Sequence, residues 1–106
     1  MQDSPRLLKL RAMLDAEPGD SFCLYAIAQE CTRLDRHAEA IDWFDRTIAA
    51  DPRHAYARFH KARLLERLGR AADARRELEL GLAAAMASGD EKAANEIAGA
   101  LAAMPA

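Results

Sequence analysis

The chain has 106 residues, of which 51% are hydrophobic and 30% are charged, and its formal net charge is −2 at pH 7. A chain of this length forms one domain that buries roughly 65% of its unfolded surface. The slightly acidic balance argues against a nucleic-acid partner, and no apolar run approaches the ~18 residues of a membrane span.

Helix caps and hydrophobic spacing predict six helices. In chain order they span about 4–16, 20–34, 37–50, 54–68, 71–87 and 90–103. The first begins with Ser4 as its N-cap and Pro5 in its first turn. Its apolar stripe consists of Leu7, Leu10 and Leu14.

The later helices are bounded by similar signals. Pro52 ends the third helix, because the residue before a proline avoids the helical conformation, and Gly69 ends the fourth in a left-handed C-cap. Ser88 and Glu91 are spaced as a capping box for the sixth helix. We expect this helix to cover the end of a helical stack. Its predicted buried face is Ala94, Ile97, Ala98, Leu101 and Met104.

A segment of the chain recurs after 34 residues. Residues 34–40, Leu-Asp-Arg-His-Ala-Glu-Ala, correspond to residues 68–74, Leu-Gly-Arg-Ala-Ala-Asp-Ala. Leu10, Phe44 and Leu78 keep the same interval, so the N-terminal segment is half a repeat in register. A period of this size, with two helices in each unit, indicates a solenoid.

The residues that carry the period resemble the tetratricopeptide repeat. That family has a large apolar residue, Leu-Gly and an aromatic residue in the first helix, then Ala, an aromatic residue and Pro in the second. Residues 21–54 match at Leu24, Ile27, Ala28, Cys31, Ala40, Phe44 and Pro52. Residues 55–88 match at Ala62, Leu65, Gly69, Ala74, Leu78, Gly81 and Leu82. In this second repeat Arg58, Lys61 and Met86 replace the family's Trp, Leu and Pro.

The resemblance implies an all-α fold, a right-handed α–α superhelix of about six antiparallel helices in a single domain. Its predicted parts are a leading half repeat at 1–20, repeats at 21–54 and 55–88, and a closing helix at 89–106. The whole chain is similar to small stand-alone bacterial proteins with two such repeats. Most of those are regarded as interaction modules.

The resemblance also implies a concave groove lined by the first helix of each repeat. The predicted groove residues are Phe22, Tyr25, Gln29 and Arg33 in the first repeat and Tyr56, Phe59, Arg63 and Arg67 in the second, with Thr32 and Glu66 on the same faces. Aromatic and arginine side chains are enriched in contact surfaces for peptides and proteins. Core packing of the rings is the alternative, and for Phe59 the two are evenly balanced because the apolar stripe of its helix is rotated from the family pattern.

Basic residues concentrate between positions 53 and 76. This basic band consists of Arg53, Arg58, Lys61, Arg63, Arg67, Arg70, Arg75 and Arg76, against two acidic residues, Glu66 and Asp73. Such a band could attract an acidic peptide or help copies of the protein to stack head to tail. A solvated helix face is the alternative, and it is the usual role of a charge run.

No group of residues supports catalysis or a metal site. The chain has no Gly-rich phosphate loop, nucleophile elbow or zincin motif, and His37, His54 and His60 are scattered. We therefore expect no enzyme activity, no cofactor and no metal. Cys23 and Cys31 lie on one predicted helix ~12 Å apart, beyond disulfide reach. Together with an N-terminal segment that lacks the apolar stretch of a signal peptide, this predicts reduced cysteines in a cytoplasmic protein.

Two classes of function remain. We favour a non-enzymatic protein–protein interaction module that binds a peptide or a protein segment in its concave groove. The alternative is a structural module that forms a weak homo-oligomer through its terminal helices, with Leu8 and Leu10 as candidates for leftover apolar surface.

Overall fold

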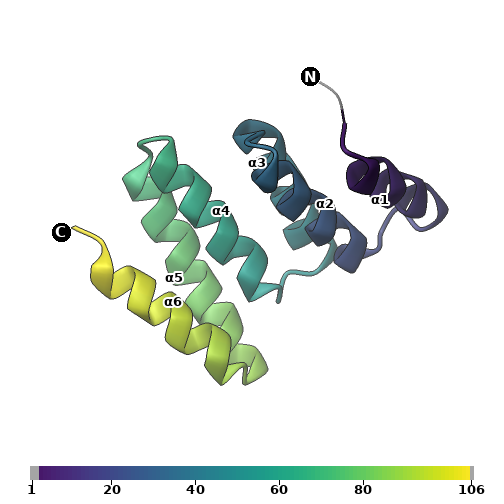
Figure 1. Cartoon of the computed structure of the whole chain (residues 1–106). Helices are drawn as coiled ribbons and strands as arrows, with labels where there is room; N and C mark the ends of the chain where they lie inside the picture. Colours follow the sequence, from purple (N-terminus) through teal and green to yellow (C-terminus); the bar gives the residue numbers. More distant parts are fainter. Residues whose placement is uncertain (1–2, 106) are drawn as a thin grey trace. The chain divides into compact units, whose positions relative to one another are not determined.

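The computed structural model describes residues 3–105, and every regular element within them is an α-helix (Figure 1). The helices are α1 (Pro5–Ala16), α2 (Ser21–Arg33), α3 (His37–Ala50), α4 (Ala55–Arg67), α5 (Ala71–Ser88) and α6 (Glu91–Ala103). The prediction of six helices in an all-α fold is confirmed for this part of the chain. The chain divides into two compact units, an N-terminal unit (α1–α3) that ends at Asp51 and a C-terminal unit (α4–α6) that begins at Pro52.

Side chains cap the starts of the first two helices, and the cap at Ser4 is the predicted one. The Ser4 hydroxyl accepts a hydrogen bond from the Leu7 backbone N–H at 3.0 Å. The Asp20 carboxylate accepts from the N–H groups of Phe22 and Cys23, at 3.0 and 3.4 Å. These bonds satisfy backbone donors that have no partner inside the helix.

The core of the N-terminal unit lies where α2 packs against α1 and α3. Its buried apolar side chains are Leu7, Leu10, Leu14, Cys23, Leu24, Ala26, Ile27, Ala28, Cys31, Ala40 and Phe44. Phe44 is 1% exposed, and its ring centroid lies 5.9 Å from that of Tyr25. Both cysteines are free and buried, as expected. Burial and a hydrogen bond to the Glu39 carboxylate raise the pKa of Cys31 to about 12.

A buried carboxylate joins α1 to α2. Glu30 is 3% exposed, and it accepts hydrogen bonds from the Arg33 guanidinium at 2.6 and 2.9 Å and from the Ser4 hydroxyl at 2.6 Å. Those hydrogen bonds, from Arg33 first and then Ser4, lower the pKa of Glu30 to about 2. The charge is therefore compensated within the core, as a buried ion requires.

A second set of ion pairs joins the start of the described chain to α1 and to the turn before α3. The Asp3 carboxylate lies 2.7 Å from a guanidinium nitrogen of Arg11 and 2.6 Å from one of Arg36. The Arg36 hydrogen bond lowers the pKa of Asp3. Helix α1 is thus held by charges as well as by its leucine stripe.

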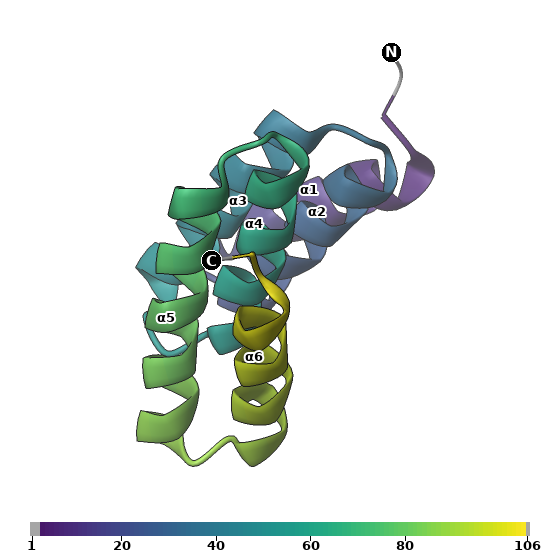
Figure 2. The same cartoon turned by 90° about the vertical axis from the view of Figure 1, so that its left-hand side faces the viewer.

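In the C-terminal unit, α4 and α6 both pack against α5, and α5 and α6 form an antiparallel pair joined by a short turn (Figure 2). The predicted capping box at this turn is wrong. Gly89 adopts a left-handed conformation with φ 72° and ends α5, while the Asp90 N–H bonds to the Ala85 carbonyl at 2.9 Å. This geometry leaves Ser88 inside α5, and the Asp90 carboxylate caps α6 by accepting from the Ala93 N–H at 3.0 Å.

The two charged residues that depart from the family pattern in α4 share one counter-ion. Glu77 of α5 lies 3.1 Å from the Arg58 guanidinium and 3.0 Å from the Lys61 ammonium. All three side chains are less than one-fifth exposed, at 14%, 19% and 17% in that order. An ion cluster therefore takes the place of the Trp and Leu side chains in the α4–α5 contact.

The buried face of α6 differs in part from the predicted one. Ala93 and Ile97 are fully buried, whereas Ala98 is exposed. The difference arises because α6 approaches α5 at Gly81, where an added Cβ would stand 3.3 Å from the Ile97 side chain. This contact puts Ile97 at the centre of the buried face and turns Ala98 to the solvent, about 100° away.

We predict that Phe44→Ala lowers the free energy of unfolding by about 3–5 kcal/mol, because it leaves a large cavity in the core of the N-terminal unit. Trp43→Ala should cost less, since Trp43 is half-buried and its ring is covered by the Arg46 guanidinium, 4.3 Å from its centroid. Urea unfolding of both variants measures this, and equal losses would contradict the assigned packing.

We predict that Glu30→Gln lowers the free energy of unfolding at neutral pH by about 1–3 kcal/mol, because Arg33 and Ser4 lose a charged acceptor. The pKa of Glu30 falls from 4.5 to about 2 on folding, so its ionised form stabilises the fold above pH 4.5, and this contribution is lost as the pH falls towards 2.

The difference in unfolding free energy between the parent chain and Glu30→Gln should therefore shrink between about pH 7 and about pH 2.5. Urea unfolding at both pH values measures it. Glu17→Gln is the control, because Glu17 is exposed. A difference that stays constant with pH would show that Glu30 does not stabilise the fold as an ion.

Candidate functional site

The predicted groove residues of the N-terminal unit lie along α2 but differ in exposure. Phe22 is 79% exposed in the first turn, while Tyr25 is half-buried against the core. Gln29 is exposed, and its side-chain amide donates to the Tyr25 hydroxyl at 3.2 Å. Arg33 is also exposed, although its guanidinium is held by Glu30. Phe22 is therefore the one large apolar side chain of this set that lies open to solvent.

The predicted groove residues of the C-terminal unit lie along α4 and contact one another. The rings of Tyr56 and Phe59 meet edge to face with centroids 6.4 Å apart. The Arg63 guanidinium lies over the Phe59 ring, 5.0 Å from its centroid, in a cation–π contact. Arg67 is exposed one turn further along. Phe59 is half-buried, so its ring lies at the edge of the core with one part exposed to solvent.

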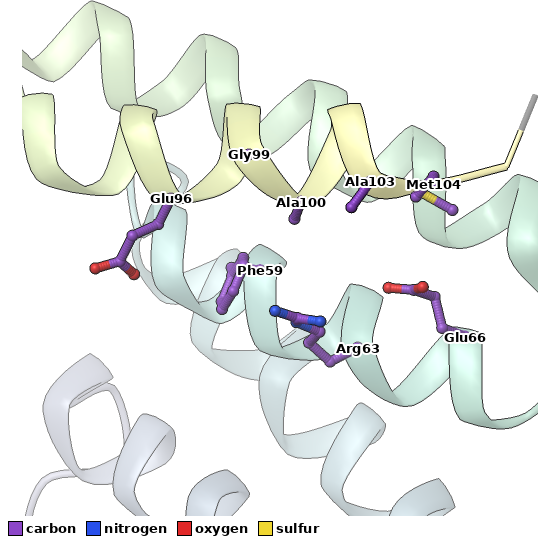
Figure 3. Close-up of a pocket in the computed structure, with 8 residues that line it drawn as sticks. All are labelled: Phe59, Arg63, Glu66, Glu96, Gly99, Ala100, Ala103 and Met104. Atoms are coloured by element: carbon purple, nitrogen blue, oxygen red, sulfur yellow. The ribbon is translucent and has the colours of Figure 1, made fainter.

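A pocket of about 400 Å³ lies between α4 and α6 (Figure 3). We call it the α4–α6 pocket. One wall consists of Phe59, Arg63 and Glu66 of α4. The other consists of Glu96, Gly99, Ala100 and Ala103 of α6 and of Met104, which follows it. Its volume falls in the range of ligand-binding pockets in proteins.

Small residues on α6 keep this pocket open. Gly99 is exposed, and a Cβ added there would meet no atom within 4 Å. The opposite holds at Gly81, where an added Cβ would stand 3.3 Å from the Cβ of Arg58 and 3.5 Å from the Ala55 carbonyl oxygen. Helices α4 and α6 thus pack tightly against α5, while the space between α4 and α6 stays unfilled.

The pocket carries charges of both signs. No ion pair joins Glu66 or Arg63 to any other residue in the described chain, although the two lie three positions apart on α4. Glu96, on the opposite wall, lies near Tyr56, and burial followed by this carboxylate raises the pKa of the Tyr56 hydroxyl. Burial, and next the Arg63 charge, lower the pKa of the neighbouring His60.

Part of the basic band is paired inside the C-terminal unit. Arg58 and Lys61 contact Glu77, as described, and Arg70 lies 2.7 Å from the Asp73 carboxylate. Arg75 donates a hydrogen bond to the Pro105 carbonyl oxygen at 2.7 Å. The band is therefore not one continuous surface of unpaired charge.

The α6 wall of the pocket was not predicted from the sequence. A signal for it exists, because α6 begins 36 residues after α4, at Glu91 compared with Ala55. Helix α5 has 18 residues where α3 has 14, and this extra length breaks the 34-residue interval. With an interval of 36, Gly99 is the counterpart of the predicted groove residue Arg63.

Residues 3–105 offer neither a metal site nor a membrane-spanning helix. No three His, Cys, Asp or Glu side chains there are grouped so that they could hold a metal ion. None of the helices in this range combines the length and the apolar character that crossing a membrane requires.

Solved structures similar to this chain are helical repeat proteins. A tetratricopeptide repeat domain protein from Salinibacter ruber is 32% identical, with a TM-score of 0.75 over 80% of this chain and 86% of that one. The type III secretion translocator chaperone SycD of Yersinia enterocolitica has a TM-score of 0.85 over 92% of this chain and 74% of that one, at 17% identity. PcrH, solved in complex with the chaperone-binding region of PopD, has the same TM-score and coverage at 18% identity. No family model and no curated protein matches the chain.

We predict opposite effects for one substitution at two glycines. Gly99→Leu should leave the thermal midpoint unchanged or slightly raised, since the added side chain meets open space and leucine favours helix by roughly 0.5–1 kcal/mol over glycine. Gly81→Leu should lower the free energy of unfolding by about 1–3 kcal/mol or more through overpacking. Thermal unfolding followed by circular dichroism compares them, and equal shifts would contradict the pocket geometry.

Proposed function

Because the chain belongs to the tetratricopeptide repeat family, we propose that it is a non-enzymatic protein-interaction module that binds a peptide or a protein segment. The observation that carries this proposal is the α4–α6 pocket, in which an aromatic ring and its stacked guanidinium face an opening kept free by Gly99. Aromatic and arginine side chains supply most of the binding energy in many protein interfaces.

The PcrH structure supports the same mode of action by analogy. That protein is solved in complex with a segment of another protein, the chaperone-binding region of PopD. At 18% identity the likeness concerns the fold, so segment binding by this chain is part of our proposal. A helical repeat of this size offers a preformed surface to an extended or helical segment.

We assign the contacts to the predicted groove residues of each unit. Phe59 and Arg63 would contact the segment inside the α4–α6 pocket, with Tyr56 and Arg67 beside them on α4. In the N-terminal unit Phe22, Tyr25, Gln29 and Arg33 would form a second contact surface on α2, in which Phe22 is the most exposed ring. The two buried free cysteines fit a reducing bacterial cytoplasm as the place of this function.

Self-association is a second candidate, and exposed apolar side chains on α1 favour it. Leu8 and Met13 are each more than half exposed, whereas Leu10 is buried in the core, so Leu10 no longer belongs to the proposed contact surface. Light scattering over a range of protein concentrations tests this candidate. A mass that rises with concentration in the parent chain and stays monomeric in Leu8→Glu would support it.

We predict that a phage-displayed library of random 12-residue peptides yields binders when it is selected on the full-length chain. Gly99→Leu should weaken these peptides at least tenfold, since the leucine side chain fills the α4–α6 pocket. Fluorescence anisotropy of labelled peptides measures the affinity. Ala102→Leu is the matched control, because it adds the same side chain on the same helix at an exposed position outside the pocket lining.

The selection can contradict the proposal in two ways. One is that the parent chain yields no binding peptide at all, and the other is that the selected peptides bind Gly99→Leu as tightly as the Ala102→Leu control. The first result would leave self-association as the remaining candidate. The second would move the binding surface away from the α4–α6 pocket.

A further inference from the structure

We infer that the α4–α6 pocket receives a lysine or arginine side chain of the partner segment. This inference rests on the proposed function, since it specifies what the binding pocket selects. It follows from the charges of the two walls, from the small residues between them and from the position of the one basic residue in the pocket.

The carboxylates of the pocket outnumber its cations. Glu66 and Glu96 stand on opposite walls, and Arg63 is the single basic residue among the lining side chains. The pocket therefore has a local charge of −1 at neutral pH, counted as one positive against two negative groups. A partner cation is attracted by two carboxylates, of which Glu96 also accepts a hydrogen bond from Tyr56, and it meets one like charge, whereas a partner carboxylate meets two like charges.

Arg63 does not act as the counter-ion of Glu66. Its guanidinium lies over the Phe59 ring at 5.0 Å, and no ion pair with Glu66 forms. Stacking on an aromatic face is a favourable position for a guanidinium and holds it beside Phe59 on the α4 wall, between Glu96 and Glu66 (Figure 3). The Glu66 carboxylate is exposed and has no ion-pair partner among residues 3–105, so it can accept donors from another molecule.

The shape of the pocket suits a long side chain with a charge at its tip. Gly99, Ala100 and Ala103 form a stretch of α6 without bulky side chains, and Glu66 and Glu96 lie towards its two ends (Figure 3). Lysine and arginine pack their apolar stems on such surfaces while the charged head stays in contact with water or a counter-ion.

This charge preference is the reverse of the acidic partner that the basic band predicts. That expectation concerns Arg67, which is exposed on α4 outside the pocket lining, and it stays a prediction. Inside the pocket the acidic residues dominate. The two can be separated by experiment, because Glu66 and Glu96 belong to the pocket and not to the basic band.

The test uses the 12-residue peptides selected on the full-length chain. We expect lysine or arginine to be enriched beside an apolar residue in these peptides. Replacing that basic residue by glutamate should abolish binding. The double variant Glu66→Gln with Glu96→Gln should weaken the parent peptides by about 5- to 10-fold, the effect of two partly exposed charge contacts. Affinity should also fall between about 50 mM and about 500 mM salt.

The matched control is the double variant Glu17→Gln with Glu79→Gln, which removes the same charge from exposed positions outside the pocket lining. Its affinity for the peptides should stay within about twofold of the parent chain. Thermal unfolding checks that both double variants are folded. Double variants with affinities equal to each other would overturn the inference, because a general charge effect would then explain the preference.

Different experimental results would contradict the inference and the proposed function. The selected peptides could be rich in acidic or purely apolar residues and still bind Gly99→Leu more weakly than the parent chain. That result would overturn the inference of a cationic side chain and leave the proposed function in place. A selection that yields no binding peptide would overturn both. Enrichment of basic residues without sensitivity to Glu66 and Glu96 would overturn the inference alone.

Discussion

The architecture of the C-terminal unit depends on the close approach of two helices to a third at Gly81. This glycine lets the Cβ of Arg58 and the side chain of Ile97 come within 3.3 Å of the place where a Cβ would stand. Both α4 and α6 pack closely on α5 at Gly81, and the space that remains between α4 and α6 is not filled by another helix. The α4–α6 pocket is the geometrical consequence, and the small residues Gly99 and Ala100 keep it open.

Residues of the basic band have two physical roles, and the face of α4 on which each residue lies decides its role. Arg58 and Lys61 lie three positions apart, face α5 and share the half-buried carboxylate of Glu77. Arg63 lies on another face of α4 and rests on the Phe59 ring. A run of like charges in a sequence therefore does not describe a surface until the partners of each residue are known.

Local signals in the sequence predicted the helices, and long-range packing accounts for the misses. The cap at Ser4 was predictable because it depends on a few neighbouring residues. The α6 wall was not, because the longer α5 helix shifts the repeat interval and moves Gly99 to the position of Arg63. The groove position of Tyr25 stays a prediction, and its ring also packs on Phe44, since a half-buried ring can serve both surfaces.

Glu30, which stabilises the fold, is paired, whereas Glu66, which lines the pocket, forms no ion pair in the described part of the chain. Glu30 is compensated by Arg33 and Ser4 inside the N-terminal unit, so its removal affects the fold. Glu66 is exposed and has no ion-pair partner in the described part of the chain, so folding gains little from its charge. A carboxylate of this kind changes the affinity of a pocket for other molecules without changing the stability of its walls. Selection for binding can therefore act on Glu66 independently of selection for folding.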